Sequence, residues 1–256
     1  MQPGMAPAVG LLPARRVIAT AWDLVTSRPK EVLLPVAAVE VPVSVVAALV
    51  IAGALSTVLR DVALDGQDRG YLALLLIVGA GQALFAQVAH GAAIVSIAAV
   101  LRGKPVPLAG ALDPAFTRMG GLLALLVILV AMSVLLALTI IGLVLLPYLV
   151  VRLALAHQAF MLEGRSPFAA LGRSWALMRG HMLRMLGVML LTFLIFLGPA
   201  ILISALDGLV AGSRGVQVAL QALVSVVQGV LAVPLVAFAS ATTTVFYLNL
   251  EDAARG

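Results

Sequence analysis

The sequence predicts an all-α fold: a polytopic membrane bundle of six transmembrane helices with kinks, plus amphipathic helices at the cytoplasmic interface. Hydrophobic residues make up 63% of the 256 residues, and the mean hydropathy is +1.17. Charged residues make up 11%, less than half of the share of about 25% that is typical of a soluble domain. Several apolar runs reach the ~20 residues that a helix needs to cross the hydrocarbon core. Together these features place the chain among integral membrane proteins.

Six apolar runs predict six spans within a membrane domain of residues 31–256. The third and fourth spans share one continuous apolar run, and a tight turn near residues 139–142 is the expected boundary between them. Prolines inside several runs predict kinks, because proline removes a backbone donor from a helix. The predicted spans lie near residues 32–59, 71–100, 119–138, 140–162, 182–206 and 216–248.

Basic amphipathic segments precede the three pairs of spans. The N-terminal segment, residues 1–30, and the segments near 107–118 and 167–179 combine apolar residues with arginines that can reach lipid headgroups. In the last segment Ser166 is a suitable N-cap, and Pro167 suits the first helical position. The chain is therefore expected to repeat one unit three times, an interfacial helix followed by a hairpin of spans. The arginines expected to bind headgroups are Arg15, Arg16, Arg165, Arg173 and Arg179.

The placement of Lys and Arg predicts the orientation of the chain. Cytoplasmic loops carry an excess of these residues, and thirteen of the 16 fall on one side of the predicted spans. Arg60, Arg69 and Arg214 fall on the other side. Both termini are therefore expected to be cytoplasmic. The net charge of +5 is explained by this topology, so no nucleic-acid partner is expected.

Sequence signatures of catalysis and metal binding are missing. The sequence contains no cysteine, no Gly-x-Ser-x-Gly elbow, no His-Glu-x-x-His pair and no glycine-rich phosphate loop. The three histidines are not arranged in a local metal-binding motif. The sequence therefore predicts a protein with no enzymatic activity, no cofactor and no metal.

Ionisable residues inside the spans form the first candidate site. Glu40, His90 and Arg152 lie about 14–16 Å from the predicted cytoplasmic ends of three different spans, at 1.5 Å per residue. An unpaired charge near the middle of the membrane costs about 2.5–3.5 kcal/mol on insertion scales. We therefore predict that Glu40 and Arg152 form an ion pair inside the bundle, with His90 or His157 beside it. The alternative is that Arg152 extends to the cytoplasmic interface and Glu40 is protonated.

A polar stripe on the last predicted span forms a second candidate site. Gln217, Gln221, Ser225 and Gln228 recur at spacings of four, four and three residues, so they share one face of a helix. One interpretation is the wall of a hydrated path. The other is a set of interhelical hydrogen bonds, each contributing about 0.6–2 kcal/mol. The second interpretation is favoured.

Three segments carry a resemblance to a known family. They are GKPVPLAGAL at 103–112, VRLALAHQAFMLEGRSPFAALGRSWALMRG at 151–180 and TTTVFYLNLE at 242–251. Together they resemble the membrane domain of the bacterial glycerophosphoryl diester phosphodiesterase family and its six-span relatives. The middle segment is the most specific, because its Arg, Glu-Gly, Ala-Leu, Arg-Ser and Arg-Gly elements follow the order of the family. The tail departs, since Asn249 stands where Asp is usual and Glu251 where Arg is usual.

The resemblance implies a six-span fold in the bacterial inner membrane. No part of the 256 residues resembles the soluble phosphodiesterase domain of some members, so the resemblance does not imply that activity. The leading expectation is a non-enzymatic accessory or scaffold protein that acts at the level of lipids or the envelope, with anionic headgroups as partners. The alternative is a transporter or channel for a small or lipid-derived solute, because intramembrane polar residues often line solute pathways. A homo-oligomer and a membrane partner protein are both left open.

Overall fold

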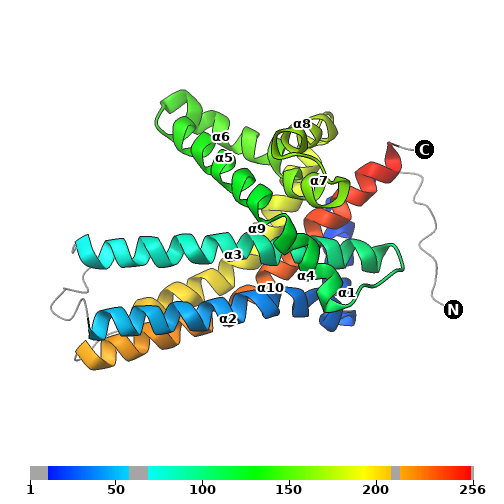
Figure 1. Cartoon of the computed structure of the whole chain (residues 1–256). Helices are drawn as coiled ribbons and strands as arrows, with labels where there is room; N and C mark the ends of the chain where they lie inside the picture. Colours follow the sequence, from blue (N-terminus) through cyan, green and yellow to red (C-terminus); the bar gives the residue numbers. More distant parts are fainter. Residues whose placement is uncertain (1–10, 58–68, 209–213, 255–256) are drawn as a thin grey trace.

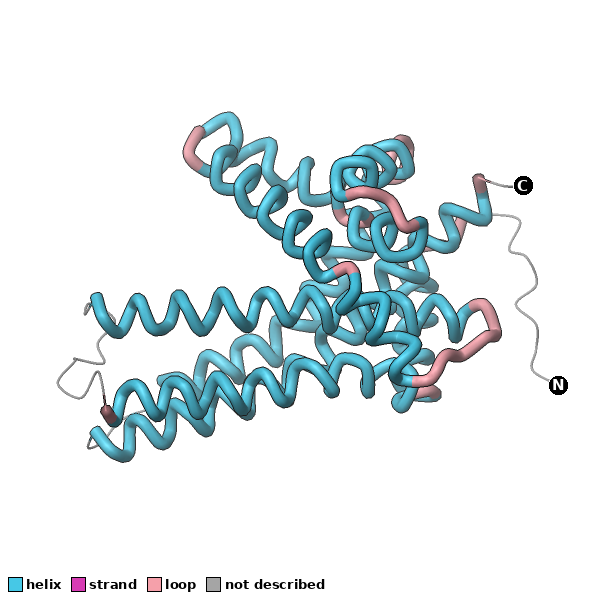
Figure 2. Tube along the Cα trace, in the orientation of Figure 1, coloured by secondary structure: helices cyan, strands magenta, loops and turns pink. Residues whose placement is uncertain are grey.

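Helix is the regular structure throughout the described residues, which are 11–57, 69–208 and 214–254 of a computed structural model (Figure 1). The tube view shows these helices and the loops that join them (Figure 2). The predicted all-α fold is confirmed. In chain order the helices are α1 (Ala14–Ser27), α2 (Pro29–Ser56), α3 (Arg69–Leu101), α4 (Leu108–Thr117), α5 (Met119–Ala137), α6 (Ile140–Leu153), α7 (Ala156–Glu163), α8 (Pro167–Leu177), α9 (Met182–Gly208) and α10 (Arg214–Ala253).

Among the described residues, five helical segments are long and apolar enough to cross a membrane. They are α2, α3, α5, the joined α6–α7 segment Ile140–Glu163 and the segment Val218–Ala253 of α10. A sixth arises if α8 and the first part of α9 form one span, although these two helices meet at a bend of 106°. At the tip of the α5–α6 hairpin, Leu138 and Ile140 are 77% and 87% exposed, as expected for side chains that face lipid. The chain is therefore a membrane protein, while the count of six spans and the proline kinks stay predictions.

Four long helices form the body of the bundle. Helices α2, α3, α9 and α10 run side by side, and the α5–α6 hairpin leaves them at an angle (Figure 1). The most extensive packing joins α2 and α10. It depends on Gly229, because a Cβ at this position would lie 2.3 Å from the Cβ of Ser44. Such close approach between helices is typical of membrane bundles, where small residues let van der Waals contacts hold the helices together.

The short helices gather at one end of the bundle. Helices α1, α4, α7 and α8 lie at the end where both ends of the described chain are found (Figure 1). Helix α1 buries Val17, Ala21 and Leu24 against the core and leaves Arg15 and Arg16 exposed, so it is amphipathic as predicted. Helices α4 and α8 lie within the segments predicted near 107–118 and 167–179, and α1 lies within the predicted segment 1–30, of which residues 1–10 are outside the described residues. Their location at the membrane surface stays a prediction.

Two breaks shape the α5–α6–α7 region. Thr139 caps α6 by accepting a hydrogen bond at 2.9 Å from the backbone N–H of Gly142, which confirms the turn predicted near residues 139–142. The second break, after Leu153, divides the predicted fourth span into α6 and α7. It is stabilised by the buried Ser174 of α8, whose hydroxyl accepts from the N–H of Leu155 at 3.2 Å and donates to the carbonyl of Arg152 at 2.9 Å.

The first turn of α5 provides a test of this packing. A Cβ on Gly121 would lie 2.3 Å from Cζ of the buried Phe160 of α7, whereas a Cβ on the neighbouring Gly120 would meet nothing within 4 Å. We expect Gly121→Ala to destabilise the protein by about 1–3 kcal/mol through overpacking. Gly120→Ala is the matched control and should be neutral or slightly stabilising, because alanine favours helix by about 1 kcal/mol over glycine. Thermal unfolding in one detergent measures both, and equal melting temperatures would contradict this contact.

Candidate functional site

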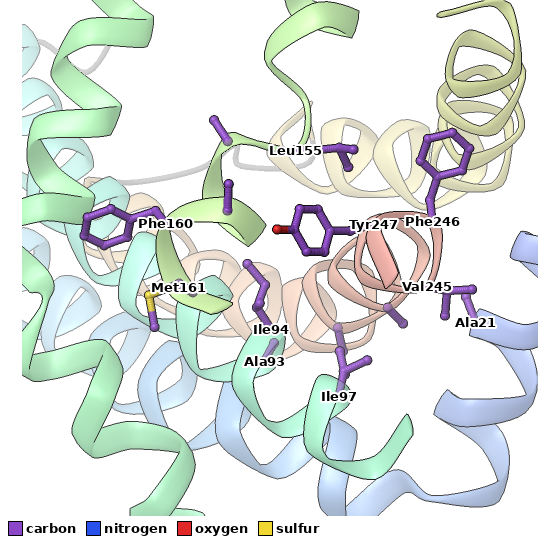
Figure 3. Packing of buried hydrophobic residues seen from close by; sticks show 14 of the residues in the cluster. Ala21, Ala93, Ile94, Ile97, Leu155, Phe160, Met161, Val245, Phe246 and Tyr247 are labelled. Carbon is purple, nitrogen blue, oxygen red and sulfur yellow. The ribbon is translucent and has the colours of Figure 1, made fainter. Parts of the chain in front are cut away.

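Glu163, the last residue of α7, joins three helices through its carboxylate. Its Oε1 accepts a hydrogen bond at 2.8 Å from Nε of Arg173 in α8 and another from the hydroxyl of Tyr247 in α10. Its Oε2 accepts from Nε of Arg165 in the α7–α8 loop. The bond to Glu163 raises the pKa of Arg173, so this guanidinium stays charged. Figure 3 shows the ring of Tyr247 in the core, with its hydroxyl directed toward α7.

The end of α7 is held in place by its backbone as well. Gly164 adopts φ 66° and ψ 26°, a left-handed conformation that closes a helix and suits glycine. Nη1 of Arg118 donates to the carbonyls of Phe160 and Met161 at 3.3 and 3.1 Å, so two free carbonyls of the last turn are satisfied. We did not predict the Glu163 cluster from the sequence. The Glu-Gly-Arg element and the tyrosine of the tail were visible there, but nothing local indicates that they meet.

Two of the predicted intramembrane residues come together. The rings of His90 in α3 and His157 in α7 contact each other edge to face, with centroids 5.3 Å apart. Nδ1 of His90 lies 2.7 Å from the hydroxyl of Ser240 in α10, and Nε2 of His157 lies 2.8 Å from Oε1 of Gln87 in α3. These four residues, which we term the histidine network, connect α3, α7 and α10 through neutral hydrogen-bonding groups.

The predicted ion pair between Glu40 and Arg152 is wrong. Arg152 donates from Nε to the hydroxyl of Tyr148 at 3.1 Å and from Nη1 to the carbonyl of Trp175 at 3.0 Å. The described residues contain no ion pair between Glu40 and Arg152. The prediction assumed one straight helix over the fourth span. Because the chain breaks after Leu153 and α8 folds back onto the break, Arg152 meets α8 instead of α2.

Glu40 also lies apart from the histidine network. Its carbonyl accepts a hydrogen bond from Ser44 and faces α10 at Gly229, whereas His90 meets α10 at Ser240. The two positions, 229 and 240, are eleven residue steps apart, which corresponds to roughly 16 Å of helix. One carboxylate oxygen of Glu40 is buried without a partner among the described residues. The predicted cluster of Glu40, His90, Arg152 and His157 therefore reduces to the two histidines.

The polar stripe on α10 lies in the half of the helix that packs on α2. Ser225 is buried and donates to the carbonyl of Gln221 in its own helix at 2.9 Å. Gln221 and Gln228 are partly buried, and Gln228 has a partner. The side chain of Gln217 lies outside the described residues. The burial of Ser225 agrees with a face that packs against another helix. The preference for interhelical packing over a hydrated path stays a prediction.

Three basic side chains contribute to the lining of a cavity at the end of the bundle that carries the short helices. This cavity, which we term the basic pocket, has a volume of about 400 Å³ and is lined by Arg173, Arg179 and His181. The rest of its lining is apolar and comes from the N-terminal segment, α8 and α10. Arg179 is exposed, whereas Arg173 is partly covered and directed by Glu163. Of the five predicted headgroup-binding arginines, the structure thus brings Arg173 and Arg179 together and leaves the pair on α1 exposed elsewhere.

A second cavity, of about 280 Å³, lies where the α5–α6 hairpin leaves the bundle. Its lining is apolar apart from Ser133, His157 and Thr243. Thr243 accepts a hydrogen bond at 2.6 Å from the fully buried Gln158, whose own Oε1 has no partner among the described residues. The histidine network therefore borders a cavity between spans. Within the described residues, no group of three or more His, Cys, Asp or Glu could hold a metal ion.

Comparison with known proteins returned no match, whether to family models, to curated proteins or to solved structures. The site is therefore interpreted from its geometry. The resemblance to the glycerophosphoryl diester phosphodiesterase membrane domain stays a prediction.

The Glu163 cluster leads to a prediction about stability. Hydrogen bonds to a charged group contribute about 1.5–3 kcal/mol, and Glu163 receives three of them at a side chain that is 17% exposed. We expect Glu163→Gln to lower the melting temperature in detergent. The neutral amide accepts weaker hydrogen bonds than the carboxylate, and its NH2 group is a donor placed among groups that are themselves donors. Asp252→Asn removes the same charge at an exposed position of α10 and should leave the melting temperature unchanged. Equal behaviour of the two variants would contradict a structural role of the cluster.

Proposed function

We propose that this chain is a non-enzymatic membrane protein that binds anionic lipid headgroups and acts as an accessory or scaffold at the level of lipids or the envelope. The observation that carries the proposal is the basic pocket, where Arg173, Arg179 and His181 line one cavity. A phosphate could be bound there by two guanidinium groups, which match its geometry. Each basic residue near an anionic membrane surface contributes about 1 kcal/mol of attraction.

The arrangement of the bundle supports a definite orientation. In the proposal the chain crosses the bacterial inner membrane six times, with α8 and α9 treated as an interfacial helix followed by a span. The short helices, both termini and the basic pocket then face the cytoplasmic leaflet, where anionic lipids attract Lys and Arg. The end of α2 at Thr57 lies at the far end of the bundle (Figure 1).

Membership of the family that the sequence resembles is part of the proposal. Its support is that the most specific segment, residues 151–180, supplies both Glu163 and the arginines that it holds. The same segment supplies Ser174, which closes the break between α6 and α7. The residues that carry the resemblance are therefore those that shape the basic end of this bundle.

A transporter or channel for a small or lipid-derived solute is the second candidate. It is favoured by the cavity beside the histidine network, because polar residues inside spans commonly mark a solute or proton path. The test is solute uptake by proteoliposomes that contain the wild-type protein or the variant His157→Leu. This substitution removes the imidazole from the cavity lining. Uptake above that of protein-free vesicles, and its loss in the variant, would favour transport over the scaffold function.

Lipid binding tests the leading proposal. Native mass spectrometry of the detergent-solubilised protein should show tighter binding of phosphatidylglycerol than of phosphatidylcholine. Arg179→Gln should weaken the binding of phosphatidylglycerol about five-fold, the equivalent of about 1 kcal/mol. Lys104→Gln is the matched control, since it removes one exposed charge at the same end outside the pocket. Equal affinities for the two lipids in the wild type would overturn the proposal.

Single cysteines test the orientation, because the natural chain has none. Ala176→Cys in α8 and Thr57→Cys after α2 introduce a thiol at exposed positions at opposite ends of the bundle. A membrane-impermeant thiol reagent applied to intact cells should label the cysteine at 57 and not the one at 176. In inverted vesicles the result should reverse. Labelling at 176 from outside intact cells would show that the topology is wrong.

A further inference from the structure

Arg152 is held by two aromatic side chains. Its guanidinium lies over the ring of Trp175 at 4.7 Å and over the ring of Tyr148 at 5.5 Å, both measured to the ring centroid. The two rings contact each other edge to face, with centroids 6.1 Å apart. Tyr148 lies one turn before Arg152 in α6, while Trp175 belongs to α8. We term these three residues the arginine cradle.

The cradle uses only part of the hydrogen-bonding capacity of Arg152. A guanidinium has five N–H donors. One donates to the hydroxyl of Tyr148 and one to the carbonyl of Trp175, so three are left. These three have no acceptor among the described residues, and the side chain of Arg152 is partly exposed. They are therefore available to a ligand outside the protein.

The charge of Arg152 lacks a counter-charge within the described chain. Its partners, a phenol, a peptide carbonyl and two aromatic rings, are all neutral, and the ion pairs of the described residues involve other arginines. Arg152 is the penultimate residue of α6, beside the break after Leu153 and the contact with α8, and no described residue of opposite charge pairs with it there. An anion outside the protein would compensate it.

The position of the cradle indicates which class of anion can reach it. Trp175 and Tyr148 are 36% and 42% exposed, and such amphipathic rings are enriched at the level of lipid headgroups. Helix α8 is amphipathic, and its buried Ser174 is bonded to the backbone of Arg152, so the cradle sits where α8 meets the end of α6. The anions at that level of a membrane are the phosphates of phospholipids.

We propose that the arginine cradle binds the phosphate of one anionic phospholipid, with the free N–H groups of Arg152 as donors. A guanidinium can engage two phosphate oxygens at once, and the two rings hold its plane in one orientation. This inference rests on the proposed headgroup binding and assigns it a second, defined site apart from the basic pocket. It also explains why the side chain does not extend away from α6: both of its bonded nitrogens are occupied by protein acceptors.

Trp175 is itself a reporter for this site. The chain has two tryptophans, so Trp22→Phe leaves Trp175 as the single fluorophore. In mixed micelles, brominated phosphatidylglycerol should quench the fluorescence of Trp175 at about five-fold lower mole fraction than brominated phosphatidylcholine. The reason is that the choline group of phosphatidylcholine competes with Arg152 for the phosphate of the same lipid. Arg152→Gln should abolish this preference. Arg152→Lys keeps the charge but not the planar donor fork, and should lose most of the preference.

Two further variants keep the test decisive. Lys104→Gln, which removes a charge outside the cradle, should keep the wild-type preference. If Arg152→Gln does not fold, Tyr148→Phe removes the acceptor of Nε while it keeps the ring and the charge, and it should weaken the preference partially. A folded Arg152→Gln protein, or a Tyr148→Phe protein, with the full wild-type preference would overturn the inference.

The outcomes separate the cradle from the function on which it rests. If the wild type shows no preference for phosphatidylglycerol by quenching or by native mass spectrometry, both proposals fail. If the wild type shows the preference and Arg179→Gln abolishes it while Arg152→Gln does not, the cradle fails and headgroup binding at the basic pocket stands. Loss of the preference in Arg152→Gln, with Lys104→Gln unchanged, supports the cradle.

Discussion

The carboxylate of Glu163 is the contact on which the basic end of the molecule depends. It fixes the last turn of α7 to Tyr247 in α10 and to Arg173 in α8, so one charge orients three helices. A carboxylate can accept several hydrogen bonds at once, and bonds to a charged acceptor are stronger than neutral ones. With α8 held in this way, the carbonyl of Trp175 accepts a hydrogen bond from Arg152. The same placement lets residues of α8 and α10 line the basic pocket together.

The two histidines inside the bundle find partners of a different kind from those of the charged groups at its end. His90 and His157 pair with neutral groups, Ser240 and Gln87, which avoids the cost of placing a charge between apolar helices. Charged groups, in contrast, cluster at the end with the short helices, where Glu163 meets its arginines. Within the described residues the bundle thus separates neutral hydrogen bonding between spans from ionic contacts at the end that carries the short helices.

Glycine residues at the helix contacts allow the helices to pack closely. Gly229 lets α10 approach Ser44 of α2, and Gly121 lets α5 approach the ring of Phe160. In a membrane the hydrophobic effect does not drive one helix toward another, so these van der Waals contacts carry much of the association. The α5–α6 hairpin diverges from the bundle toward its tip (Figure 1), and large side chains near that tip, such as Ile140, are exposed.

The sequence by itself determined the helical class, the extents of the apolar segments, the α5–α6 turn and the amphipathic character of α1, because apolar runs, caps and helical periodicity are local properties. It also singled out His90 and His157, although it paired Arg152 with Glu40. Only the tertiary structure decided the partners. The direction of Arg152 depends on the break after Leu153 and on the return of α8, and the bond between Glu163 and Tyr247 joins residues 84 positions apart. Such contacts follow from how whole helices pack, a property that spacing along the chain does not encode.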